Sequence, residues 1–147
     1  MQHRGETEII DEAVLIGDAR ENLKERGRVC IQFADKRNKE MFDEFKKKIW
    51  TLVPVANKEM ILEKEFDMFE DEARKHAAEL KPICPACRIK AWDRQEDIPE
   101  NICKLVRVNP RAIPQQSSIQ RVIDLDYKCD FGHGNTLLIE HPRKWRG

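Results

Sequence analysis

The sequence lacks any run of apolar residues near the roughly 20 that a membrane-spanning helix needs. Its N-terminal stretch Met1-Gln-His-Arg-Gly-Glu-Thr-Glu has no hydrophobic segment of the kind found in signal peptides. A charge excess of either sign is also missing, because 27 Lys and Arg residues balance 27 Asp and Glu residues. No overall charge therefore draws the chain to nucleic acid or to a membrane, and we expect an intracellular, cytoplasmic protein.

Cysteine is present, but in a number and a distribution that do not suit a disulfide framework. Four of the five cysteines lie after residue 80, and the odd number leaves one without a partner. Clustered cysteines without a secretion signal are more typical of metal binding in a reducing compartment. The charge changes in the same region, because residues 1–80 carry four more acidic than basic side chains and residues 81–147 four more basic than acidic ones.

The first 80 residues predict a domain of two or three helices. Apolar residues recur at helical spacing over residues 7–26, again up to residue 52, and most regularly between about residue 57 and residue 80. Large apolar residues occupy every second position of residues 29–33, which predicts a short strand or an extended connection. The residues expected to begin or end these helices are Thr7, Gly27, Asp35, Asn38 and Pro54.

After residue 80 the helical period is lost, so we place a domain boundary at Lys81-Pro82, between a helical domain 1–80 and a second domain 81–147. The best strand is 119–129, where Ile123, Leu125 and Tyr127 share one parity and charged residues share the other. Shorter strands are predicted at 136–139, at 103–108 and, more weakly, at 89–92, with a loop at 109–118. The expected fold class is α+β, with helices followed by a small antiparallel sheet.

Four residues in two pairs form the clearest chemical pattern. Cys84 and Cys87 are separated by two residues, and Cys129 and His133 by three, with Gly132 allowing a sharp turn. Three thiolates and an imidazole are the ligands that a tetrahedral zinc ion takes in structural sites. The sequence therefore predicts one structural Zn²⁺ held by these four side chains.

At Cys84-Pro-Ala-Cys87 and Tyr127-Lys-Cys-Asp-Phe-Gly-His133 the chain resembles the zinc-ribbon superfamily. The resemblance covers about residues 82–141, and no family is recognised for residues 1–80. Many zinc ribbons work in transcription, replication or RNA processing, so the resemblance implies the fold, the metal and a nucleic-acid-associated role. The chain departs from the pattern in having His133 where many ribbons have a fourth cysteine.

Catalysis is not expected. Four protein ligands close the coordination sphere of zinc, whereas hydrolytic zinc keeps one position for water. A metallohydrolase or nuclease would need an open position or a carboxylate cluster, and the dense carboxylates near the first pair lie in a segment that reads as an exposed linker. Those carboxylates are Asp93, Glu96, Asp97 and Glu100.

Two further residues have side chains able to bind metal. Cys103 could replace one ligand, but its strand-like setting favours a buried thiol. His141 precedes Pro142 near the end of the chain and is expected to be a solvated histidine. The alternative is that it replaces one of the four metal ligands.

Basic residues of the second domain predict a phosphate-binding surface with a stacking aromatic. They are Arg107, Arg111, Arg121, Lys128, Arg143, Lys144, Trp145 and Arg146. The leading hypothesis is thus a non-enzymatic zinc protein that regulates transcription or otherwise serves nucleic acids, alone or within a transcription-type protein complex. The alternative is a protein-interaction or assembly module, with the helices as a docking surface and a homodimer as one form.

Overall fold

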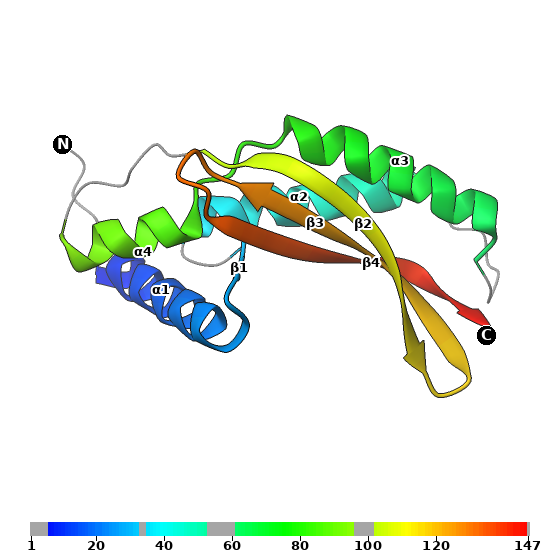
Figure 1. Ribbon diagram of the computed structural model, residues 1–147, viewed down its shortest axis with the longest axis horizontal. Helices are drawn as coiled ribbons and strands as arrows, with labels where there is room; N and C mark the ends of the chain where they lie inside the picture. Colours follow the sequence, from blue (N-terminus) through cyan, green and yellow to red (C-terminus); the bar gives the residue numbers. More distant parts are fainter. Residues whose placement is uncertain (1–5, 33–34, 53–60, 96–101, 147) are drawn as a thin grey trace.

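The computed structural model describes residues 6–32, 35–52, 61–95 and 102–146 (Figure 1). Along the chain these residues form α1 (Glu6–Arg26), β1 (Val29–Cys30), α2 (Lys36–Leu52), α3 (Glu63–Glu79), α4 (Pro85–Asp93), β2 (Lys104–Gln115), β3 (Ser118–Lys128) and β4 (Gly134–Arg146). The predicted α+β class is confirmed. Among the described helices none is long and apolar enough to cross a membrane.

The four strands form one mixed sheet in the order β1-β4-β3-β2. Its three long strands are antiparallel neighbours, whereas β1 pairs in parallel with the start of β4, where Val29 lies opposite Asn135. Figure 1 shows α2 and α3 along one face of the sheet and α1 beside α4 at the end nearest β1. The β3–β4 turn lies at this same end, so the chain brings α4 and the turn together.

One apolar core joins the helices to the sheet. The buried face of α2 includes Phe42 and Phe45, that of α3 includes Phe66 and Phe69, and both faces follow the predicted spacing. Tyr127 of β3 enters this core, with its ring 5.7 Å from that of Phe42 and its hydroxyl donating to a backbone carbonyl of α3. Residues on both sides of the predicted boundary at residue 81 therefore share one hydrophobic cluster; the division into two domains stays a prediction.

Two predictions of local structure are wrong. Residues 89–92 belong to α4 and not to a strand, because Pro85 starts a helix that continues to Asp93. Residues 109–118 are mainly strand and not a loop: β2 extends to Gln115, and only a tight turn separates it from β3. Prolines at 110 and 114 are compatible with β2 because it is an edge strand, whose outward positions need no N–H donor.

Element ends also differ from expectation. The third helix begins at Glu63, and the start predicted near Asn57 lies outside the described residues. Strand β4 runs over 134–146, much further than the predicted 136–139, because it pairs with β3 along nearly the whole length of β3.

His141 is not solvated, which corrects the sequence-based expectation. Its side chain is 1% exposed and packs against Phe69, with ring centroids 4.8 Å apart, and against Phe66. The backbone N–H of Arg143 donates to its Nδ1 at 3.1 Å. Burial lowers the pKa of His141, and the positive charge of Arg121 lowers it further. This histidine is a neutral core residue on β4 and lies outside the group of residues that could hold a metal.

We expect His141 to make stability depend on pH. The unfolded chain binds a proton at this histidine near pH 6.5, whereas burial lowers the pKa of the ring in the folded chain, so stability falls as pH decreases through that value. The charged groups near the ring are Arg121, Arg143 and its partner Glu65. Between pH 7.5 and 5.5 the loss from this group should approach about 1 kcal/mol.

The variant His141→Asn keeps an acceptor near the position of Nδ1 but does not titrate. Urea unfolding at pH 7.5 and 5.5 should show a smaller pH-dependent loss for the variant than for the wild type. Equal losses in the two proteins would contradict the assignment.

Substitution of Tyr127 tests whether the helices and the sheet unfold together. Its hydroxyl donates to the carbonyl of Ala77 at 2.8 Å inside the core, and Leu80 N also donates to that carbonyl at 3.3 Å. The substitution Tyr127→Phe should therefore cost only about 1 kcal/mol. Urea unfolding followed by circular dichroism and by tryptophan fluorescence should give one coincident transition, shifted in the variant. The control Phe131→Leu alters a 77% exposed side chain and should not shift it.

Candidate metal centre

The first ligand pair is placed by the N-terminus of α4. Cys84 is the residue that caps this helix and Pro85 is its first residue, so Cys87 lies in the first turn. The N–H of Arg88 donates to the carbonyl of Cys84 at 3.0 Å, which closes that turn. One helical turn therefore brings the two sulfurs to the same side, and the positive end of the helix dipole favours their thiolate forms.

The second pair is placed by the turn between β3 and β4. Cys129 follows the last residue of β3, and His133 precedes the first residue of β4. Gly132 has φ of +82°, a left-handed conformation that glycine adopts without strain, and its N–H donates to the carbonyl of Cys129 at 2.9 Å. The turn is thus fixed by its own backbone, and both side chains leave it toward α4.

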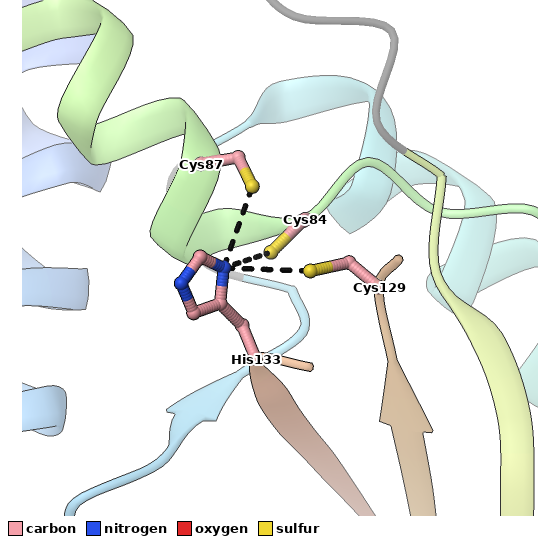
Figure 2. A group of neighbouring side chains, drawn as sticks. All are labelled: Cys84, Cys87, Cys129 and His133. Carbon is pink, nitrogen blue, oxygen red and sulfur yellow. Dashed lines mark hydrogen bonds between the residues drawn. The ribbon is translucent and has the colours of Figure 1, made fainter. Parts of the chain in front are cut away.

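The four predicted ligands converge (Figure 2). Nδ1 of His133 lies 3.7 Å from Sγ of Cys84, 3.4 Å from Sγ of Cys87 and 3.4 Å from Sγ of Cys129. In a tetrahedral zinc site, bond lengths of about 2.3 Å to sulfur and about 2.05 Å to nitrogen place such atoms about 3.6 Å apart. All four ligand atoms lie within 4.8 Å of one another, so the group can hold one metal ion.

The surroundings suit a metal with soft or borderline ligands. The three cysteines are at most 8% exposed, and His133 is partly exposed. Burial lowers the pKa of His133, and Lys90, whose Nζ lies 3.5 Å from Nε2, lowers it further; both effects favour the neutral ring that a metal ligand needs. A hydrogen bond with Cys103 and burial raise the pKa of Cys84, whereas the backbone N–H of Cys87 lowers it. A bound divalent cation would deprotonate that thiol.

Two buried polar residues hold the first pair in place, and neither was predicted for this role. Asn38 of α2 is 1% exposed; its amide donates to the carbonyl of Ile83 at 2.8 Å and accepts from the N–H of Ile83 at 3.0 Å. Arg88 of α4 is 2% exposed and lies 3.2 Å from a carboxylate oxygen of Glu12 in α1. Sequence analysis predicted Asp35 or Asn38 as the cap of a helix, and Asp35 has that role.

The predicted basic surface divides between two faces of the sheet. Arg107 pairs with Asp126 at 3.1 Å and Arg111 with Asp124, and these carboxylates alternate along β3 with the residues that face the helices. Arg121, by contrast, lies 4.1 Å over the ring of Phe66 on the helical side.

The C-terminal members of the predicted surface differ among themselves. Arg143 is 7% exposed and pairs with Glu65 of α3. Lys144 is exposed and Trp145 is partly buried, with its ring packed against the core cluster. The side chain of Arg146 lies outside the described residues.

A hollow of about 370 Å³ lies beside the metal centre, and sequence analysis did not predict it. Among the described residues, three cations line it, Arg28, Arg107 and Lys128, with one carboxylate, Asp126, which pairs with the two arginines at 3.7 and 3.1 Å. Arg28 comes from the connection between α1 and β1, far from the other residues in sequence, so only the parallel pairing of β1 with β4 brings it here.

Comparisons of the chain with family models, with curated proteins and with solved structures found no match. The resemblance to zinc ribbons therefore stays a prediction that rests on the four ligands and their spacing.

Substitution of one ligand should abolish stoichiometric metal binding. Cys129→Ser replaces a thiolate by a hydroxyl, which is a poor zinc ligand, whereas Cys30→Ser makes the same change at a partly buried thiol of β1. Zinc content after dialysis should be one per chain for the wild type and for Cys30→Ser, and far below one for Cys129→Ser. Full zinc content in Cys129→Ser would show that the four residues do not form the site.

Proposed function

We propose that this protein is a non-enzymatic zinc-binding module that binds nucleic acid through the basic hollow beside its metal centre. Zinc is the metal that best suits three thiolates and one imidazole at tetrahedral spacing. Its role is to cross-link the start of α4 to the β3–β4 turn, two segments that are far apart in sequence. In small zinc domains such a link contributes on the order of 10 kcal/mol to folding.

The arrangement of ligands supports a structural rather than a catalytic metal. All four tetrahedral positions have a protein donor, and three of those donors are buried. Of the carboxylates considered for hydrolysis, Asp93 pairs with Arg20, and Glu96, Asp97 and Glu100 lie outside the described residues. Without a free coordination position, substrate activation by the metal is not expected.

The hollow is the observation that carries the nucleic-acid proposal. Three cations face one carboxylate there, so Arg28, Arg107 and Lys128 leave an excess of two positive charges for a phosphate group. Phe131, which is 77% exposed, belongs to the same β3–β4 turn that begins after Lys128. Phosphate contacts beside an exposed aromatic ring are the combination with which proteins bind single-stranded nucleic acids.

Salt dependence of binding tests this proposal. Fluorescence anisotropy with labelled single-stranded DNA, single-stranded RNA and duplex DNA should detect binding at low salt that weakens steeply as salt rises. The triple variant Arg28→Ala, Arg107→Ala, Lys128→Ala should reduce the slope of log affinity against log salt by about 2 for a single strand. The matched control Lys46→Ala, Lys47→Ala, Lys48→Ala removes three positive charges from α2 and should leave the slope nearly unchanged.

Two outcomes would overturn the proposal. Equal losses in the two triple variants would mean that affinity follows net charge and not the hollow. Absence of binding to all three nucleic acids at low salt, with the zinc site loaded, would favour the assembly module instead, and sedimentation would then show whether the chain associates with itself.

A further inference from the structure

Cys103 lies next to the metal centre without belonging to it. The residue is fully buried, immediately before β2, and its N–H donates to the carbonyl of Pro82 at 2.8 Å. Its sulfur is not part of the group whose ligand atoms lie within 4.8 Å of one another. A fourth cysteine therefore lies beside the candidate metal centre, but the fourth member of the group is His133.

Asn135, the second residue of β4, contacts the same two sulfurs. Its side chain is 1% exposed, and Nδ2 lies 3.3 Å from Sγ of Cys103 and 3.8 Å from Sγ of Cys84. The same nitrogen lies 3.3 Å from the carbonyl oxygen of His133. A single buried amide thus touches a ligand sulfur, a non-ligand sulfur and the backbone of the histidine ligand.

The charge of the loaded site explains why such donors are needed. Three thiolates, one neutral imidazole and one divalent ion sum to a net charge of minus one. Water reaches this charge poorly, because Cys84 is fully buried and the other two cysteines nearly so. A buried anionic sulfur is costly unless N–H or S–H groups donate to it, and outer partners of this kind raise metal affinity.

We propose that Asn135 is a positioning residue of the metal centre: its buried amide donates to the Cys84 thiolate and to the neighbouring sulfur of Cys103, and it holds the backbone of His133 beside them. This inference rests on the proposed binding of zinc and assigns a role to one residue outside the ligand set. Of the two orientations of the amide, the opposite one would turn Oδ1 toward the thiolate lone pairs and repel them. Oδ1 has no hydrogen-bond partner in the described part of the chain, so turning it away loses no bond.

Cobalt substitution tests whether Cys103 is a ligand. Thiolate-to-Co²⁺ charge-transfer absorption grows with the number of bound thiolates, and the d–d bands report the tetrahedral geometry. Cys103→Ser should keep the charge-transfer intensity of three thiolates with nearly wild-type zinc affinity, because a serine oxygen still accepts from the Asn135 amide.

Asn135 is tested with the same two measurements. Asn135→Asp puts an acceptor and a negative charge beside the thiolates, and zinc affinity should fall by about 10- to 100-fold. Asn135→Ser, which keeps a small donor, should lie between the aspartate variant and the wild type. Cys30→Ala removes a cysteine of β1 that is not part of the metal-binding group and should match the wild type in both measurements.

Two results would overturn the proposal. Loss of charge-transfer intensity in Cys103→Ser would make Cys103 a ligand. Wild-type zinc affinity in Asn135→Asp would remove any role for the amide. If the wild type itself binds no zinc, the proposed function fails first, and a chain that binds zinc but no nucleic acid still tests Asn135.

Discussion

The arrangement of the other elements depends on the close contact between the N-terminus of α4 and the β3–β4 turn. Each segment supplies two of the four residues that can hold a metal. A tetrahedral metal accepts only one relative placement of four donor atoms, so a bound ion would fix the position of α4 on the end of the sheet. Helix α1 packs against α4, and β1 follows α1 into the sheet beside β4. A bound metal would thus help to set the position of the N-terminal segment.

Buried polar groups transmit this constraint to the rest of the molecule. Asn38 ties α2 to the residue before Cys84 through two hydrogen bonds, and Arg88 ties α4 to α1 through Glu12. Each of these side chains would be costly to bury without its partners. They specify one arrangement of the helices around the centre, whereas the aromatic core of α2, α3 and β3 supplies most of the apolar burial. Specificity and bulk stability therefore come from different residues.

The sequence predicted what depends on local pattern and missed what depends on distant pairing. Apolar spacing identified α2 and α3, and the cysteine and histidine spacing identified the four ligands. The short run from Ile89 to Trp92 was too brief to distinguish a helix from a strand, and Pro85 at a helix start decided it. Prolines at 110 and 114 suggested a loop because an edge strand cannot be recognised before the sheet order is known. Burial of His141 and the position of Arg28 likewise follow from strand register, which no local pattern contains.

Asn135 links the metal centre to the hollow. It lines the hollow, together with Gly134 and Lys128, while its side chain reaches the sulfurs of Cys84 and Cys103. Strand β3 ends at Lys128 and the next residue is Cys129, so a cation of the hollow is directly attached to the candidate metal centre. A bound metal would link the turn that joins Lys128 to Gly134 to the start of α4 and would thereby hold two walls of the hollow in place. Under the proposed function, the metal would influence binding without touching the bound molecule, because it holds the backbone that carries the charges.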